Sequence, residues 1–317
     1  MKKTLLRLLF PVTLSMALAQ GAAAQDKLSV ILDWFVNPDH GPIIVARERG
    51  YFKDANLQVE IVAPANPTDP PKLVAAGRAD IAVSYQPQLH LAVHEGMELL
   101  RVGTLVSTPL TCLVTLEAGP IKSVRDLAGK KVGFAVAGVQ EVLLAAMLRH
   151  NGVDPSKVEK INIGFSISPA LMSRQVDGVI GAFRNFELNQ LAIEGSAGRC
   201  FYPELEGVPS YDELIYVAHA TRMNKPAIRR FIAATERATL FIRNNPKESW
   251  DIFSATSKEL TNELNRRAWQ DTFHRFATRP AAMDYGRYEA FDEFMHKMGA
   301  VPSRTPVSKL AIDVTAP

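Results

Sequence analysis

The sequence predicts an α/β protein made of two lobes with a ligand cleft between them, on three observations. From residue 27 to about residue 220, apolar runs that favour strands alternate with helical patterns, as in α/β proteins with mainly parallel sheets. Two segments, AGRADIAVSYQ (76–86) and SRQVDGVIGAFRN (173–185), share a short helix followed by an acidic residue that opens an apolar strand. This similarity indicates two lobes of related construction. After LIYVAHA (214–220) the pattern changes to long helices.

The amino-terminal residues have the order of a secretory signal. Lys2 and Lys3 precede the apolar stretch LLRLLFPVTLSMALA, and the small residues of QGAAAQ follow it. We expect residues 1–24 to be a signal peptide that is cleaved after Ala24, which would release a soluble protein into the periplasm. A membrane anchor is disfavoured, because Arg7 interrupts the apolar stretch and the stretch is too short to span a bilayer.

The first part of the first lobe is expected over residues 25–112. Pro42 stands in the first turn of a helical pattern, where proline is well tolerated, and Asn56 marks the loop after that pattern. The expected order is a strand (27–35), a helix (41–56), a strand (57–65), a short helix (69–79), a strand (80–85), a helix (88–97) and an extended run (98–106).

The second lobe is expected over residues 113–215, and residues 216–317 are expected to return to the first lobe as a helical tail. No linker rich in Pro, Gly or Ser separates these parts, so we expect extended crossings near TCLVTLEAG (111–119) and ELIYVAHAT (213–221). A ligand would lie in the cleft where strand ends and helix amino termini converge. The expected elements are an extended segment (124–136), a helix (140–152), a strand (160–165), a helix (168–175), a strand (177–183) and tail helices at 224–246, 248–257 and 263–278.

Composition and motifs exclude several classes of protein. The net charge of +3 is small for 317 residues and no basic run is present, so we expect no nucleic-acid partner. The seven His residues lack ligand spacing, which disfavours a metal site. Serine-hydrolase, P-loop and zinc-protease motifs are absent, and GFAVAG (133–138) fails the dinucleotide-binding pattern. Cys112 and Cys200 are compatible with a disulfide or with two buried thiols.

Two stretches carry a resemblance to a known family. LDWFVNPDHGPIIVARERGYF (32–52) and VEIVAPANPTDPPKLVAAGRADIAVSYQ (59–86) resemble the thiamine-pyrimidine family, and the similarity extends from about residue 27 to about residue 275. That family includes periplasmic proteins that bind formylaminopyrimidine or hydroxymethylpyrimidine for ABC transporters, and fungal enzymes that make the thiamine pyrimidine. The resemblance implies a two-lobed type 2 periplasmic binding protein fold, a monomer, and an ABC permease in the inner membrane as its partner.

The enzyme function of the family can be tested within the sequence. The fungal enzymes use a lysine-bound pyridoxal phosphate and a histidine that lie just after the acidic residue corresponding to Asp80. An ungapped alignment from Asp80 places Ser84 at the lysine position and Gln88 at the histidine position. Since a serine forms no Schiff base, we expect no enzyme activity of this type and no cofactor.

Candidate ligand-binding residues lie at the ends of the predicted strands. Trp34 and Tyr85 each close a strand, where an aromatic face can stack on a flat ring. Asn37 and His40 follow Trp34 and could donate to a ring nitrogen or a formyl oxygen. The alternatives are a core Trp, a half-buried Tyr, and Asn and His residues that only form the turn.

Two further candidates belong to the second lobe. Gly138 opens a predicted helix, where free backbone N–H groups favour an acceptor, although ordinary helix capping explains this glycine equally well. By the resemblance, Glu187 corresponds to a carboxylate that faces the exocyclic amine of the pyrimidine. Arg184 or Asn185, in the same stretch GAFRNFE (181–187), is a further candidate ligand residue. The alternative for Glu187 is a surface salt bridge, for example with Arg184.

These expectations combine into one functional hypothesis with alternatives. The protein would be a periplasmic solute-binding protein that delivers a thiamine pyrimidine precursor to an ABC importer. Hinge closure of the two lobes would accompany binding. The alternatives are a binder of another flat heterocycle such as riboflavin, a ligand-sensing partner of a membrane receptor and, with least support, a pyrimidine-synthesising enzyme.

Overall fold

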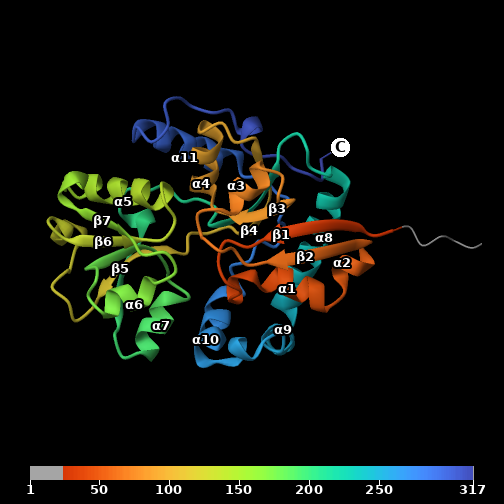
Figure 1. Cartoon of the computed structure of the whole chain (residues 1–317), viewed down its shortest axis with the longest axis horizontal. Helices are drawn as coiled ribbons and strands as arrows, with labels where there is room; N and C mark the ends of the chain where they lie inside the picture. The colour runs from red at the N-terminus through yellow and green to blue at the C-terminus, as the bar shows by residue number, and fades with distance from the viewer. Residues whose placement is uncertain (1–23, 317) are drawn as a thin grey trace, which may run out of the picture.

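The computed structural model describes residues 24–316 and arranges them in two α/β lobes (Figure 1). The expected signal peptide, apart from Ala24, lies outside these described residues. Within the described part of the chain, no helix is both long enough and apolar enough to cross a membrane.

Each lobe is built around a five-stranded sheet. Across the first sheet the order is β2 (Leu57–Val62), β1 (Asp26–Ile31), β3 (Ile81–Ser84), β10 (Leu214–His219) and β4 (Leu99–Val106). Across the second sheet the order is β7 (Glu159–Asn162), β6 (Lys131–Phe134), β8 (Gly178–Phe183), β5 (Thr111–Leu116) and β9 (Gly198–Phe201).

Both sheets are mixed, whereas the sequence pattern indicated mainly parallel sheets. β10 runs antiparallel to β3 and β4, and β5 runs antiparallel to β8 and β9. These two strands are the ones that enter their lobe directly from the other lobe. They start at the edge where the parallel strands end, so they run in the opposite direction. The crossings are residues 107–110 and 202–213, which immediately precede β5 and β10.

The internal similarity seen in the sequence corresponds to equivalent positions in the two lobes. Asp80 precedes β3, and its Oδ2 accepts from the backbone N–H of Ser29 at 2.7 Å. Asp177 precedes β8, and its Oδ2 accepts from the backbone N–H of Lys131 at 2.9 Å. Each acidic residue therefore fastens the start of a strand to the parallel strand beside it.

Helices cover both faces of the first sheet. The predicted helix over residues 41–56 is divided into two at Gly50, whose φ of 71° no helix interior tolerates. One face is covered by α1 (Gly41–Glu48), α2 (Tyr51–Asp54), α8 (Lys225–Asn244) and α9 (Pro246–Ser254), and the other by α3 (Pro70–Ala75) and α4 (Gln86–His94). The amphipathic α8 buries Phe231, which stacks on Phe52 with ring centroids 5.3 Å apart.

The second sheet is likewise covered on both faces. One face packs on α5 (Val139–His150), and the other on α6 (Ile167–Met172) and α7 (Glu187–Ile193). Short 3₁₀ turns complete the fold: η1 (Pro38–His40), η2 (Val124–Leu127), η3 (Pro155–Lys157), η4 (Pro203–Leu205), η5 (Lys258–Thr261) and η6 (Val307–Lys309).

The carboxyl-terminal helices do not all return to the first lobe as predicted. α10 (Glu263–Thr272) packs on η1, but α11 (Tyr285–Lys297), which the sequence pattern did not predict, bridges both lobes (Figure 1). Its Tyr288 lies in the core of the first lobe, while Phe291 and Met295 lie in the core of the second.

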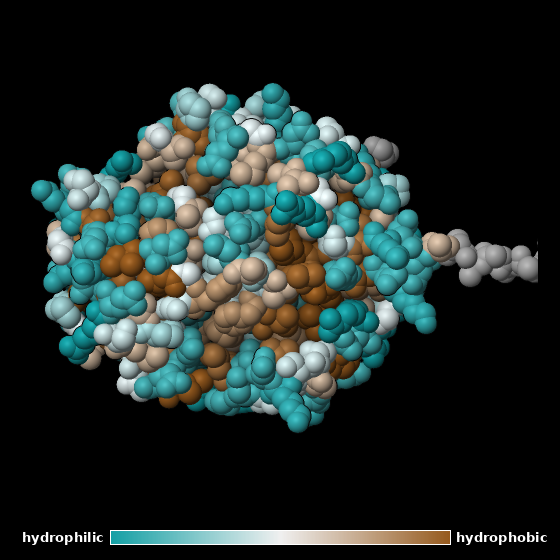
Figure 2. Space-filling view, in the orientation of Figure 1, coloured by the Kyte–Doolittle hydropathy of each residue, from teal (hydrophilic) through white to brown (hydrophobic). Residues whose placement is uncertain are grey.

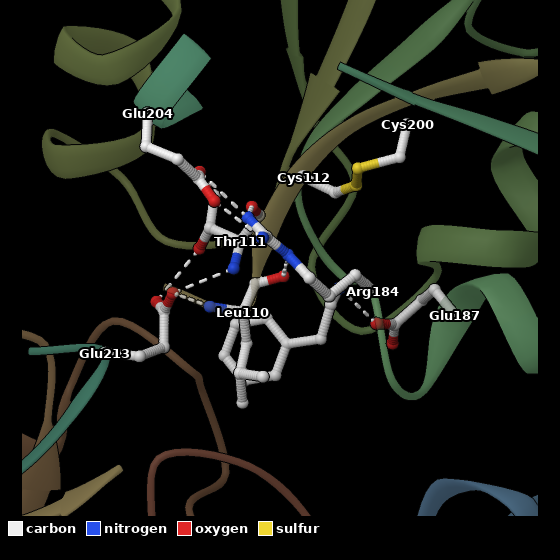
Figure 3. The surroundings of a disulfide bond; sticks show 9 residues. Leu110, Thr111, Cys112, Arg184, Glu187, Cys200, Glu204 and Glu213 are labelled. Atoms are coloured by element: carbon white, nitrogen blue, oxygen red, sulfur yellow. Dashed lines mark hydrogen bonds and ion pairs between the residues drawn. A yellow bond between two sulfur atoms is a disulfide. The ribbon is translucent and has the colours of Figure 1, made fainter. Parts of the chain in front are cut away.

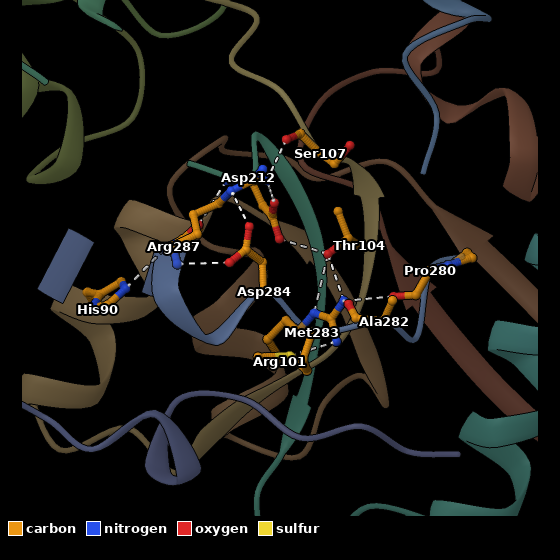
Figure 4. Close-up of polar contacts among 11 residues, drawn as sticks. His90, Arg101, Thr104, Ser107, Asp212, Pro280, Ala282, Met283, Asp284 and Arg287 are labelled. Atoms are coloured by element: carbon orange, nitrogen blue, oxygen red, sulfur yellow. Dashed lines mark hydrogen bonds and ion pairs between the residues drawn. The ribbon is translucent and has the colours of Figure 1, made fainter. Parts of the chain in front are cut away.

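Polar contacts fasten α11 to the crossings (Figure 4). Arg287 donates to the carbonyl of Ser107 in the first crossing at 2.7 Å and to Asp212 in the second. The fully buried Arg101 donates to the carbonyls of Pro280 and Ala282, both at 2.7 Å, just before α11. These bonds hold the chain that leads into α11 against the first sheet.

A buried carboxylate joins the two crossings directly (Figure 3). Glu213 accepts from the backbone N–H groups of Leu110 and Thr111 at 2.6 and 2.8 Å, and from the Thr111 hydroxyl at 2.9 Å. Beside it, Cys112 and Cys200 form a disulfide that links β5 to β9 with their Cα atoms 5.5 Å apart. This settles the alternative between a disulfide and two free thiols in favour of the disulfide.

Candidate functional site

A cavity lies between the two lobes. The space among its walls measures about 380 Å³ when the open side is included. The first lobe contributes Asp33, Trp34, Asn37, Asp39 and Tyr85, and the second contributes Ala135, Val136, Gln140, Ile167, Gly181, Phe183, Phe186 and Glu187.

Trp34 reaches from the first lobe into the second. β1 ends at Ile31, and the following bend turns the indole toward the second sheet, where it packs against Ile163 and Ile167. The indole is 8% exposed and lines the cavity. Its edge meets Phe165 with ring centroids 4.5 Å apart and an angle of 62°. An indole fixed in this way offers part of its surface to a flat ligand.

Other aromatic residues extend this contact between the lobes. Phe35 packs against Phe165 and Phe186 with ring centroids 6.4 and 6.0 Å apart. Phe35 and Phe165 remain 42% and 38% exposed, so this aromatic contact between the lobes reaches the surface. On the face shown in Figure 2, hydrophobic side chains gather near the middle of the molecule and over the adjoining part of the first lobe.

Tyr85, Asp33 and His40 form a buried chain of hydrogen bonds. The Tyr85 hydroxyl donates to Asp33 Oδ2 at 2.8 Å, and His40 Nε2 lies 2.9 Å from Asp33 Oδ1. Since His40 Nδ1 accepts from the backbone N–H of Asn37, its Nε2 carries the proton and donates to Asp33. Burial, and then the Asp33 carboxylate, raise the pKa of Tyr85 well above its usual value, so its hydroxyl stays neutral.

Two of the predicted ligand residues, Asn37 and His40, form hydrogen bonds in and around the turn before α1. Asn37 lines the cavity, but its side chain accepts from the backbone N–H of Asp39 at 2.8 Å and donates to the carbonyl of Phe35 at 3.1 Å. His40 is fully buried behind the cavity wall and both its ring nitrogens are engaged. Its place is to orient Asp33.

At the start of α5 the cavity is lined by Gln140 rather than by Gly138. The N–H of Gly138 is taken by Glu141 at 3.0 Å, and Gly138 faces solvent. Gln140 Oε1 accepts from the backbone N–H groups of Ala135 and Val136 at 2.7 and 3.0 Å. This pair of bonds fixes which end of the amide faces the cavity, so Nε2 is presented there as a donor.

Glu187 begins α7 and lines the cavity with 6% of its surface exposed. Its Oε2 accepts from the backbone N–H of Phe183 at 2.6 Å, and Arg184 points away to form an ion pair with Glu204 (Figure 3). Burial raises the pKa of Glu187 to about 8. Near pH 7 the carboxyl is therefore mostly protonated, with the proton on the remaining oxygen, Oε1.

Asp39, in η1, is a third acidic residue on the wall, and it is 1% exposed. Its Oδ1 accepts from Asn185 Nδ2 at 2.6 Å and from the Thr272 hydroxyl at 3.2 Å. Its Oδ2 is buried and has no hydrogen-bond partner among the described residues. Burial raises the pKa of Asp39 to about 6, so near pH 7 it is mostly ionised.

The charges of the cavity wall determine which kinds of ligand can bind there. The lining includes three acidic side chains, Asp33, Asp39 and Glu187, and no Lys or Arg. An anionic ligand would meet Asp33 and Asp39 without a compensating cation, which is costly in a site of low dielectric. The wall instead suits a flat ring that carries N–H donors and acceptor nitrogens.

The positions of the fungal lysine and histidine lie outside this wall. Ser84 is fully buried, and its hydroxyl donates to Gln88 Oε1 at 2.9 Å. Ser84 and Gln88 therefore form a hydrogen bond with each other inside the first lobe. The cavity lining contains no lysine that could form a Schiff base.

Four of the six predicted ligand residues line the cavity: Trp34, Asn37, Tyr85 and Glu187. His40 and Gly138 do not. Nine lining residues were not among the predicted ligand residues: Asp33, Asp39, Ala135, Val136, Gln140, Ile167, Gly181, Phe183 and Phe186. Asp33 and Asp39 stand within the quoted stretch LDWFVNPDHG, and their position beside Trp34 was a signal that could have identified them.

The fold, with its cavity between two lobes, is that of a periplasmic binding protein, as predicted. The alkanesulfonate-binding protein SsuA from Xanthomonas axonopodis pv. citri matches it with a TM-score of 0.72 and 15% identity, over 92% of this chain and 99% of that chain. The periplasmic aliphatic sulphonate binding protein SsuA from Escherichia coli matches with a TM-score of 0.67 and 16% identity, over 90% and 91%.

Within this class the chain belongs to the NMT1/THI5-like family, whose model matches residues 37–249. A Haemophilus influenzae protein with a thiamine-biosynthesis name is 45% identical, over 98% of this chain and 99% of its own length. The formylaminopyrimidine-binding protein of Halalkalibacterium halodurans is 33% identical, over 82% and 79%. A 4-amino-5-hydroxymethyl-2-methylpyrimidine phosphate synthase of Schizosaccharomyces pombe is 26% identical, over 80% and 76%. The predicted family is thus confirmed.

Proposed function

We propose that the protein is the periplasmic solute-binding component of an ABC importer and delivers a thiamine pyrimidine precursor of the formylaminopyrimidine or hydroxymethylpyrimidine type. The observation that carries this proposal is the wall of the cavity, where Trp34 and Tyr85 lie beside acidic and amide groups with no cation. The relative that binds formylaminopyrimidine supports the same ligand class.

The hydrogen-bonding groups of the wall complement an aminopyrimidine. Such a ring offers acceptor nitrogens and one amino group. Gln140 Nε2 and the proton on Glu187 Oε1 are donors that suit ring nitrogens or a formyl oxygen. The resemblance to the family assigned Glu187 to the exocyclic amine. With its pKa raised to about 8, the protonated carboxyl fits a ring nitrogen better.

The alternative of a pyrimidine-synthesising enzyme has a direct test. The protein, incubated with pyridoxal phosphate, should form no stable imine, because Ser84 and Gln88 hold the positions of the reactive residues. A stoichiometric imine absorbance that maps to one lysine near the cavity would overturn the binding function.

The ligand itself can be identified on the protein as it is purified. Native mass spectrometry should detect a bound small molecule whose mass matches a substituted aminopyrimidine. Release of that molecule on unfolding, followed by its fragmentation, would identify the substituents. If the mass instead matched riboflavin or another heterocycle, that molecule would be the ligand and the pyrimidine would not.

A further inference from the structure

Asp39 lines the cavity with two carboxylate oxygens in different situations. Its Oδ1 accepts from Asn185 of the second lobe and from Thr272 of α10, whereas its Oδ2 is buried without a hydrogen-bond partner among the described residues. Described residues therefore donate hydrogen bonds to one oxygen of this carboxylate and none to the other. Buried polar atoms nearly always have a hydrogen-bond partner, so an orphaned carboxylate oxygen in a ligand cavity indicates a missing donor.

The other acidic groups of the wall are already satisfied or hold a proton. Asp33 accepts from Tyr85 and from His40 through its two oxygens. Glu187 accepts from a backbone N–H through one oxygen, and the other oxygen carries a proton near pH 7. Among the three acidic side chains of the wall, Asp39 is therefore the one with an oxygen left for an amino group of the ligand.

The hydrogen bond between Asp39 and Asn185 links this acceptor to closure of the two lobes. Asn185 follows β8 in the second lobe, while Asp39 precedes α1 in the first, so their bond of 2.6 Å forms only where the lobes meet. Closing the site without a ligand buries Oδ2 with nothing to compensate it. A ligand N–H that reaches Oδ2 removes this cost, so closure becomes favourable when such a donor is bound.

We propose that Asp39 determines specificity by accepting a hydrogen bond from an amino group of the ligand, so that the lobes close on heteroaromatic amines and not on anions. This inference rests on the proposed function and narrows its ligand class. A hydrogen bond to Asp39 Oδ2 would also distinguish the ligands of this chain from sulfonates, because a sulfonate has no N–H group to donate to Oδ2.

The test compares Asp39→Asn with a matched variant, Asp271→Asn. Asp271 at the end of α10 also accepts from a second-lobe residue, Asn189, at 2.8 Å, but it lies outside the cavity. The probes are 4-amino-5-hydroxymethyl-2-methylpyrimidine and its analogue in which a methyl group replaces the 4-amino group. Calorimetry gives the affinities, and solution scattering gives the radius of gyration with and without probe.

Asp39→Asn should weaken binding of the amino compound roughly tenfold to a hundredfold, the range for a hydrogen bond to a charged group. It should leave the methyl analogue within a factor of three, and the ligand-free variant should be more compact than the wild type. Asp271→Asn should change both affinities equally and by little. Equal losses for both probes with Asp39→Asn would overturn the proposal and leave Asp39 as a structural contact. If the wild type bound neither probe, the proposed function itself would fail.

Discussion

Replacing Glu187 by Gln gives a prediction that depends on the protonation state of this residue. In the ligand-free site Glu187 is mostly protonated below about pH 8, because burial raises its pKa. Gln has the shape of a protonated Glu, with a carbonyl that can accept from the N–H of Phe183 and an NH₂ group that can donate into the cavity. Glu187→Gln should therefore keep an affinity for the aminopyrimidine within a few-fold of wild type at pH 7.

The difference between the two proteins should emerge at alkaline pH. The form of Glu187 that binds is the protonated one, and it is lost as the pH rises through about 8. Each pH unit above that value costs about 1.4 kcal/mol, which is a tenfold loss of affinity. At pH 9 the wild type should bind about tenfold more weakly than at pH 7, while Glu187→Gln should not change.

Calorimetric titrations from about pH 5 to about pH 9 on both proteins measure this difference. All other titrating groups, including Asp39 and Tyr85, are the same in the two proteins, so the variant corrects for them. Below about pH 6 both proteins should weaken together as Asp39 takes up a proton. The opposite outcome is that Glu187→Gln loses tenfold or more in affinity at pH 7 while the wild type binds more tightly above pH 8. That result would show that the carboxylate is the binding form.

Three other perturbations separate ligand binding from the architecture that supports it. Trp34→Ala removes the stacking face, so calorimetry should show at least tenfold weaker binding of amino and methyl pyrimidines alike; a loss confined to one of them would contradict a stacking role. Glu213→Ala leaves two buried N–H groups unpaired and should lower the free energy of unfolding by about 2–4 kcal/mol in urea, whereas Glu213→Gln keeps one oxygen for both and should cost less than half as much. Replacing Cys112 and Cys200 by Ala should lower that free energy by about 2–5 kcal/mol, yet leave ligand affinity unchanged, because neither residue lines the cavity; a loss of affinity would show that the disulfide shapes the site.

Local sequence patterns predicted much of the fold. The alternation of apolar runs and helical patterns identified the parallel strands of both lobes. The central strands β3 and β8 are buried over nearly their whole length between helices, whereas the edge strands β2 and β7 are partly exposed. The direction of β5 and β10 could not be predicted from periodicity, since it depends on where the chain enters each lobe. α11 escaped prediction because it covers parts of two cores and its apolar face follows no single stripe.

For the site, too, local sequence could identify some residues but could not predict contacts between residues far apart in the chain. Trp34 and Tyr85 could be identified because each follows a strand, and strand ends converge on a cleft in this class of fold. His40 looked like a ligand group because its partners, Asp33 and the backbone N–H of Asn37, depend on the three-dimensional turn. The contacts of Asp39 could not be seen at all, since Asn185 and Thr272 are 146 and 233 residues away.

Calorimetry of the protein with formylaminopyrimidine, and separately with a short alkanesulfonate, tests the central claim most directly. The two ligands distinguish the chemistry of this cavity from that of proteins which share only its fold. One molecule of formylaminopyrimidine should bind per protein, and the alkanesulfonate should give no heat of binding, because the wall holds Asp33 and Asp39 and no Lys or Arg. Saturable binding of the sulfonate, with none of the pyrimidine, would contradict the account.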